Sequence, residues 1–406
     1  MHTSRLSKMC LAGLEVVFAL LCLTFLPLFH SSALAAEASP QIALHQGTTT
    51  QHDWNMFSFN SSRYDPYEQN LTTQNVSHLK LGWSVNPTQN EECSSVAASN
   101  GIVYLAPEGE YNANVYALKA SSGQKVWSVS RKNLSGCSSP AVVNGVVYVS
   151  SGEVDALNAT TGKLLWSNNT LGAITSPVVA NGLLYVGTNA NQIVALKTST
   201  GAVSWSATLG GSINTISATV ANGVLYIGAY DNNLYAFNAT TGKQLWVVST
   251  GGYVYSTPAV DGGKVYIVSN GRDLEAFNAT TGGHLWTVTS PVNGLDISPA
   301  AANGIVYYCV SQSVYSTLQA YDETSGKLLW TSELSTVQFA PAIANGVVYA
   351  SFFDSAGIAA FDAKTGKTLF SEYFTNQGQG ATSPTVDNGT VYIGTSYGNL
   401  DAFRLA

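Results

Sequence analysis

A nine-residue pattern that recurs about every 40 residues constrains the fold of this chain more than any other feature. It reads NATTGKLLW at residues 158–166, and close copies stand at 238–246 and 278–286. Looser copies occur, and the glycines of all the copies are Gly123, Gly162, Gly201, Gly242, Gly282, Gly326 and Gly366. A period near 40 residues indicates a repeat architecture.

Each repeat carries the signals of four short β-strands. In one repeat, a strand of small residues at 138–143 is followed by an Asn-Gly turn and a second strand at 146–150. A variable loop leads to an alternating strand at 154–159, and the Thr-Gly turn leads to a fourth strand at 163–168. Asn-Gly between apolar runs is a strong hairpin signal, because both residues adopt positive φ. Four-stranded units at this period, with no helical segment between them, predict the blades of an all-β propeller.

The aromatic residue of the pattern has a predicted place in this architecture. Small residues suit the first strand, which lies nearest the crowded axis of a propeller. The aromatic residue, Trp166 in the copy at 158–166, falls on the fourth and outermost strand. We therefore expect the glycine to form the hairpin and the aromatic ring to dock one blade against the next, a structural role for all the copies.

The number of strands predicts eight blades and the way in which they close. The signature that opens each second strand, NGVVY or a variant, occurs eight times and ends at Tyr104, Tyr148, Tyr185, Tyr226, Tyr266, Tyr307, Tyr349 and Tyr392. The last third strand, at 400–405, has no fourth strand after it, whereas a spare aromatic strand stands at 79–85. We predict that this N-terminal strand completes the last blade, because such pairing removes an exposed sheet edge. The propeller would then span residues 79–406.

The first 36 residues have the layout of a secretory signal peptide. Arg5 and Lys8 precede an apolar run from 9 to 29, and ALAA at 33–36 offers small residues for cleavage. A lead segment at 37–78 separates this region from the propeller. We expect a monomer that is secreted or held in the cell envelope, and the alternative is that the apolar run stays as an N-terminal membrane anchor.

Composition excludes several classes of function. The chain is 45% hydrophobic, which is ample for a core, and its formal charge is −7 with only 17 Lys and Arg. With no basic cluster, nucleic acid is a poor partner. After residue 36 the histidines are His45, His52, His78 and His284, too scattered for a metal cluster or a Ser-His-Asp arrangement. No P-loop or GxGxxG motif occurs.

The repeats resemble the pyrroloquinoline quinone (PQQ)-like repeat, the AxDaxTGkxxW unit of quinoprotein alcohol dehydrogenases. The lead at 53–83, DWNMFSFNSSRYDPYEQNLTTQNVSHLKLGW, is similar to the opening of those enzymes. The same repeat also builds the propeller lipoprotein of the outer-membrane β-barrel assembly machinery. The resemblance implies an eight-bladed propeller, but one fold hosts many functions.

The resemblance also implies where an enzyme site would lie. Quinoprotein alcohol dehydrogenases hold PQQ and calcium with a Glu and an Asn, use a catalytic Asp and cap the cofactor with paired cysteines. Glu153 stands near the Glu position, and Asn189 or Asn191 is available at the Asn position. The Asp position falls in 205–218, which contains no carboxylate, and Cys93 stands alone at the cysteine position. We therefore expect no catalytic residue, no metal site and no cofactor. The alternative is a reduced quinoprotein that binds PQQ with calcium through Glu153 and Asn189.

Three cysteines remain after the signal region. Cys93 and Cys137 precede the innermost strands of consecutive repeats at the same repeat position. Equivalent positions of neighbouring blades lie close together, and an exported protein meets oxidising conditions. We predict a Cys93–Cys137 disulfide, with two unpaired thiols as the alternative. Cys309 falls on a second strand and is predicted to be a buried free thiol.

Loops on one end of the propeller are the predicted binding face. The variable loops between second and third strands and the linkers between blades should gather there. The candidate residues are aromatic or acidic, namely Glu92, Tyr253, Tyr255, Asp296, Phe339, Glu372 and Tyr373. Aromatic side chains are common at interfaces. The leading hypothesis is an exported, non-catalytic propeller that binds a protein, a peptide or an extracellular polymer. A scaffold subunit in an envelope assembly is a further alternative.

Overall fold

The computed structural model describes residue 60 and residues 62–87, 94–106, 114–131, 138–213, 216–269, 273–289, 297–311, 316–353, 357–374 and 382–405. Contacts between Cα atoms divide the chain into two units, Met1–His45 and Gln46–Ala406, and every described residue belongs to the second. The expected signal peptide therefore lies outside the described residues. Within them, no helix is both long and apolar enough to cross a bilayer.

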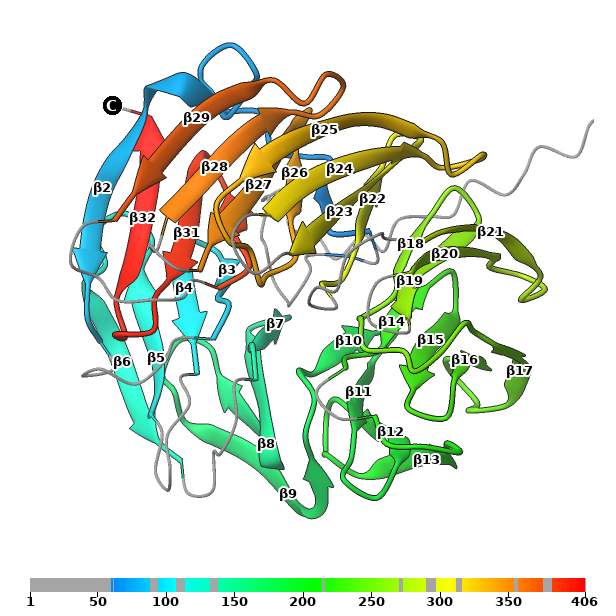
Figure 1. Ribbon diagram of the computed structural model, residues 1–406. Helices are drawn as coiled ribbons and strands as arrows, with labels where there is room; N and C mark the ends of the chain where they lie inside the picture. Colours follow the sequence, from blue (N-terminus) through cyan, green and yellow to red (C-terminus); the bar gives the residue numbers. More distant parts are fainter. Residues whose placement is uncertain are drawn as a thin grey trace, which may run out of the picture. The chain divides into compact units, whose positions relative to one another are not determined.

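The described residues form eight sheets, one for each predicted blade, and within each blade consecutive strands pair antiparallel (Figure 1). Blades 1 to 4 contain the following strands: β3 (Ala97–Ser99), β4 (Ile102–Leu105), β5 (Asn114–Lys119) and β6 (Lys125–Ser130); β7 (Ala141–Val143), β8 (Val146–Asn158) and β9 (Leu164–Ala173); β10 (Val178–Ala180), β11 (Leu183–Gly187), β12 (Gln192–Lys197) and β13 (Val203–Thr208); and β14 (Thr219–Ala221), β15 (Val224–Ala229), β16 (Asn233–Asn238) and β17 (Gln244–Ser249). In blade 2, β8 covers both expected middle strands without a loop between them.

Blades 5 to 8 repeat the same order. They contain β18 (Ala259–Asp261), β19 (Lys264–Ser269), β20 (Asp273–Asn278) and β21 (His284–Val288); β22 (Ala300–Ala302), β23 (Ile305–Ser311), β24 (Ser316–Asp322) and β25 (Leu328–Leu334); β26 (Ala342–Ala344), β27 (Val347–Phe352), β28 (Gly357–Asp362) and β29 (Thr368–Tyr373); and β30 (Thr385–Asp387), β31 (Thr390–Gly394) and β32 (Leu400–Leu405). The innermost strands contact one another in sequence from β3 to β30, and β30 contacts β3 again. The predicted ring of eight blades is confirmed.

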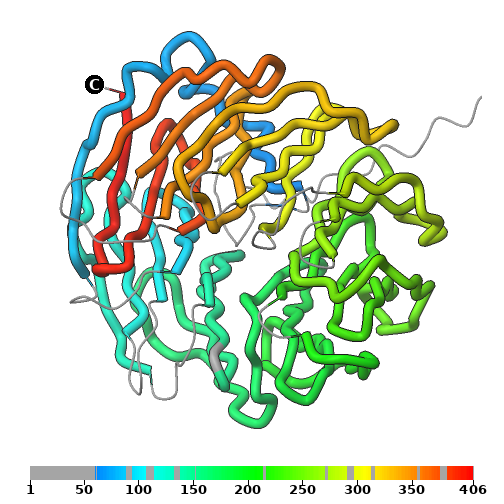
Figure 2. The backbone as a smooth tube through the Cα atoms, in the orientation of Figure 1, coloured from blue at the N-terminus to red at the C-terminus, as the bar shows by residue number. Residues whose placement is uncertain are grey.

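The N-terminal strand closes the ring as predicted. β2 (Leu79–Val85) pairs antiparallel with β32, with Leu81 opposite Phe403 and Val85 opposite Leu400. The sheet order of blade 8 is therefore β2-β32-β31-β30. The blue strand β2 and the red strand β32 lie side by side in both views (Figures 1 and 2).

The repeated aromatic residue docks one blade against the next, which confirms its predicted role. The indole nitrogen of Trp166 in blade 2 donates a 2.8 Å hydrogen bond to the Thr198 carbonyl of blade 3. The hydroxyl of Tyr148, on the second strand of blade 2, donates to the same carbonyl at 3.4 Å. Indole bonds of the same kind to the following blade are made by Trp83, Trp127, Trp205, Trp246, Trp286 and Trp330.

Blade 7 departs from this rule, and the neighbouring blade explains why. Its outer strand carries Phe370 where the other blades carry Trp. In blade 8 no Thr-Gly turn connects β32 to the outer strand, because that strand is β2. Phe370 instead packs edge-to-face on Phe403 with a centroid distance of 6.4 Å. A ring without an N–H donor suits this place, since the usual turn is missing there.

The lead segment is built into the ring, which the sequence did not indicate. The backbone carbonyl of Ser62 accepts from Ala301 of β22 at 2.9 Å. The next residues form β1 (Tyr64–Asp65), a short strand parallel to β26. The 3₁₀ helix η1 (Val76–His78) follows and leads into β2. The segment thus crosses the innermost strands of several blades before it joins blade 8.

The lead carries three buried charged residues, Arg63, Asp65 and Glu68. Arg63 is 2% exposed. Its backbone φ is 59°, a conformation that is uncommon for residues other than glycine. Burial lowers the pKa of its guanidinium from 12.5 to about 9. The lead therefore contributes a buried charged group beside the inner strands.

Candidate functional site

At blade 4, the linker to the next blade meets the variable loop of its own blade at one end of the sheet. The linker after blade 4 lies along the hairpin between the second and third strands of that blade. Its Thr250 nitrogen donates to the Asn232 carbonyl at 2.9 Å, and its Val254 nitrogen donates to the Ala229 carbonyl at 3.2 Å. We call this end of the blades the loop face.

Three tyrosines pack together on the loop face at blades 4 and 5. Tyr230 stacks on Tyr253 with a centroid distance of 5.7 Å, and it meets Tyr255 edge-on at 4.7 Å. Tyr253 and Tyr255 are perpendicular at 6.1 Å. Tyr253 is 48% exposed although it packs on two rings. These residues form the tyrosine cluster, an aromatic platform in which Tyr253 is open to solvent.

Two of these tyrosines were predicted, and the third was missed. Tyr253 and Tyr255 belong to the linker, so their exposure was expected from sequence. Tyr230 follows directly after β15, at the hairpin that the linker covers. An aromatic residue beside the turn residues Asp231 and Asn232 was the available signal.

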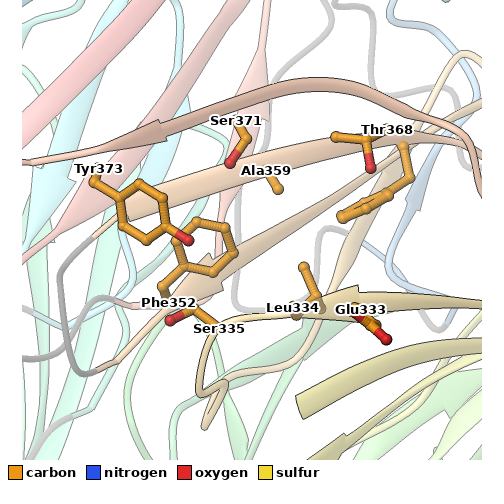
Figure 3. Close-up of a pocket in the computed structure, with 9 residues that line it drawn as sticks. Glu333, Leu334, Ser335, Phe352, Ala359, Thr368, Ser371 and Tyr373 are labelled. Atoms are coloured by element: carbon orange, nitrogen blue, oxygen red, sulfur yellow. The ribbon is translucent and has the colours of Figure 1, made fainter. Parts of the chain in front are cut away.

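A pocket of about 430 Å³ opens between blades 6 and 7. Its lining comes from the outer strand of blade 6 and from three strands of blade 7, namely Glu333, Leu334, Ser335, Phe352, Ala359, Phe361, Thr368, Ser371 and Tyr373. Figure 3 shows the rings of Phe352 and Tyr373 side by side, with a centroid distance of 5.1 Å. Tyr373, which is 53% exposed, is thus the predicted residue that lines a cavity.

The pocket exists because blade 7 has a small residue at one repeat position. Ala359 precedes Ala360, the third-strand alanine that lies opposite the outer aromatic residue. The residues at the same position in the other blades are Tyr116, Asp155, Val194, Tyr235, Glu275, Gln319 and Asp401. In blade 4, for example, Tyr235 stacks on Phe237 with an interplanar angle of 7°. Ala359 leaves the equivalent space above Phe361 open.

The remaining predicted face residues do not join one site. Phe339 is half-buried and lies 6.5 Å from Phe353 between ring centroids. Glu372 alternates with Ser371 and Tyr373 along β29, so its side chain points to the face away from the pocket. Glu92 and Asp296 lie outside the described residues, and so do Cys93 and Cys137. Cys309 is a fully buried free thiol, as predicted.

The two residues at quinoprotein-like positions both stand beside the end of β9. Gly152, next to Glu153, lies opposite Ala173, and the Asn189 nitrogen donates to the Gly172 carbonyl at 3.0 Å. Glu153 and Asn189 therefore flank the same short strand end. Calcium takes six to eight oxygen ligands, and no group of three or more His, Cys, Asp or Glu that could hold a metal occurs among the described residues. Glu153 and Asn189 by themselves supply fewer oxygens than calcium requires, and residues 205–218 contain no carboxylate.

A comparison with known protein families identifies the family of this chain. The family described as outer membrane protein assembly factor BamB matches residues 150–274, 215–308 and 272–406, which together span 150–406. The chain belongs to this family. The BamB family is built from PQQ-like repeats, so the resemblance seen in the sequence is confirmed. No curated protein matched the sequence.

Solved structures share the propeller fold of this BamB family member. A quinohemoprotein alcohol dehydrogenase from Pseudomonas putida HK5 is 16% identical, with a TM-score of 0.69, and the match covers 87% of this chain and 80% of that one. The enzyme of the same type from Comamonas testosteroni is 17% identical, with a TM-score of 0.68 and the same coverage. BamB from Moraxella catarrhalis is 17% identical, with a TM-score of 0.63, covering 80% of this chain and 97% of that one. Identities this low show the fold alone.

Proposed function

We propose that this protein is an exported, non-catalytic binding module that holds a protein partner on its loop face. The tyrosine cluster carries the proposal. Tyr253 is 48% exposed yet fixed by Tyr230 and Tyr255, so its ring is already ordered before a partner arrives. Tyrosine is enriched at the energetic centres of protein interfaces, and an ordered ring loses little conformational entropy on binding.

Membership of the BamB family supports a partner that is a protein. The family description names an assembly factor, and such a protein acts through contacts with other proteins. The signal-peptide layout of residues 1–36 supports export to the compartment in which such an assembly forms.

Site-specific photocrosslinking in the producing cells tests the proposal. The photoreactive residue p-benzoylphenylalanine is placed at position 253, and a matched control places it at position 245. Leu245 lies on the outer strand β17 of blade 4 and is 47% exposed, so the two positions are equally accessible. We expect a discrete protein adduct at 253 that is absent at 245. Tyr253→Ala should then weaken binding of the captured partner roughly tenfold or more.

Other outcomes count against a protein partner. Equal adducts at both positions, or none at 253, would remove the support for this face. Retention of the purified protein on an insoluble extracellular polysaccharide, lost in Tyr253→Ala, would replace the protein partner with a polymer.

The alternative is a reduced quinoprotein, and the convergence of Glu153 and Asn189 on the end of β9 favours it over any other enzyme class. We expect that PQQ, Ca²⁺ and primary alcohols or sugars give no dye reduction above a blank without protein. Turnover that disappears in Glu153→Ala but persists in Glu372→Ala would establish the alternative instead.

A further inference from the structure

We infer that the pocket between blades 6 and 7 binds an alkylammonium group, supplied either by a lysine side chain or by a free primary amine. The site is separate from the tyrosine cluster, and the inference does not depend on the proposed function. It rests on the shape of the pocket, on its aromatic wall and on one carboxylate.

The floor of the pocket is apolar and buried. Phe352 is 2% exposed, Phe361 is 1% exposed and Leu334 is 7% exposed. The ring of Tyr373 covers Phe352 at 5.1 Å and is itself open to solvent. A chain of four or five methylene groups matches such a surface, since its burial removes apolar area from water. Aromatic faces also attract a cation within about 6 Å.

The described part of the lining contains a single acidic group, Glu333. In Figure 3, Phe352, Tyr373 and Ser335 lie toward one end of the pocket, and Glu333 and Thr368 lie toward the other. Glu333 is exposed, and within the described ranges the ion pairs are Arg131–Asp155 and Lys264–Glu323, neither of which involves it. Among the residues that the structure describes, no basic side chain lines the pocket. The negative charge of Glu333 is therefore available to a cationic ligand.

Hydroxyl groups complete the match to an ammonium. Ser335, Thr368 and Ser371 line the pocket with oxygens that accept hydrogen bonds. An ammonium has three donors and no acceptor, so one carboxylate with nearby hydroxyls satisfies it. An anion would meet Glu333 with no compensating positive charge. A stem that lies along the Tyr373 and Phe352 rings, with its nitrogen toward Glu333, contacts the aromatic, hydroxyl and acidic parts of the lining.

Calorimetric titration of the purified protein tests the inference. The probes are Nα-acetyl-lysine amide, pentylamine and Nα-acetyl-norleucine amide, which has an uncharged side chain. We expect the lysine and pentylamine probes to bind at least tenfold more tightly than norleucine amide. If pentylamine binds and Nα-acetyl-lysine amide does not, the source of the group is a free amine. If both bind, the pocket recognises the ammonium group itself.

Three substitutions make the test specific. Glu333→Gln should weaken the binding of Nα-acetyl-lysine amide at least fivefold. Ala359→Gln, which copies Gln319 of blade 6, should fill the pocket and abolish binding. Glu372→Gln is the matched control, because it removes the same charge from the opposite face of β29 and should leave affinity unchanged. The inference is overturned if norleucine amide binds as well as lysine amide, or if Glu333→Gln and Glu372→Gln have equal effects. Glu333 is exposed, so its variant should fold even if Ala359→Gln does not.

Discussion

Gly162 of blade 2 lies directly against the indole ring of Trp127 in blade 1: a Cβ atom at Gly162 would come within 2.8 Å of that ring. The glycine of the recurrent turn thus has two functions. It adopts φ 70° to form the hairpin, and it leaves room for the aromatic side chain of the preceding blade. The same contact joins Gly123 to Trp83 at the junction where the ring closes.

Gly162→Ala should therefore destabilise the protein by more than backbone strain alone. A matched control is Gly145→Ala, because Gly145 has φ 75° but nothing within 4 Å of a Cβ atom. The control should cost about 1–2 kcal/mol from the left-handed backbone, and Gly162→Ala about 1–3 kcal/mol more from overpacking. Urea denaturation of both variants measures the difference. Equal losses of stability would show that the glycine is needed for the turn only.

Removal of the closing strand should expose the edge of blade 8. A chain that begins at Ser94 lacks β2, so β32 loses the pairing of Leu400 with Val85. Unpaired edge strands associate with other chains, and we expect aggregates on size-exclusion chromatography and a lower melting temperature. A control chain that begins at Asn60 keeps β2. A monomeric truncated protein with an unchanged melting temperature would contradict closure by β2.

Stability should fall at alkaline pH because buried phenols and a buried thiol resist ionisation. Burial raises the pKa of Tyr185 and Tyr226 to about 12, and that of Cys309 to about 12 as well. In the unfolded chain these groups lose their protons near pH 8.5–10. Their stabilising contribution is therefore fully present below the unfolded pKa values and is lost as pH rises toward 12.

Melting temperatures between pH 8 and pH 12 check this expectation. The native protein should lose stability steeply above about pH 10, and Tyr185→Phe should show a shallower loss because it removes one of the ionising groups. The absorbance of tyrosinate should rise together with unfolding. A flat stability profile to pH 12 would contradict the burial of these hydroxyls.

The Cys93–Cys137 disulfide stays a prediction, because both residues lie outside the described ranges. Mass spectrometry of an unreduced digest, made from protein exported by its own host, should show the two peptides joined. Cys309 supplies an internal control, since its buried thiol should react with iodoacetamide only after denaturation. Alkylation of Cys93 and Cys137 in the folded protein would contradict the disulfide.

The fold of this protein was determined almost entirely by local sequence. Each Asn-Gly and Thr-Gly turn needs only its own residues, and its repetition sets the number of blades. The sequence also predicted that the strand containing Trp83 closes the ring, because the third strand of the last blade, at 400–405, had no fourth strand after it. The docking role of Trp166 followed from its place on the outermost strand. These features depend on period and on turn chemistry, both of which are visible in one dimension.

Only the tertiary structure decided where the candidate sites lie. Ala359 reads as an ordinary small residue, and it opens a pocket only because Glu333 and Leu334 of the preceding blade face it. Tyr230 joins Tyr253 because the linker folds back over a hairpin of its own blade. Arg63 is buried because the lead pairs with β26, nearly 280 residues later in the chain. These three contacts occur once each and depend on the packing of whole sheets, so the periodic pattern of the sequence does not encode them.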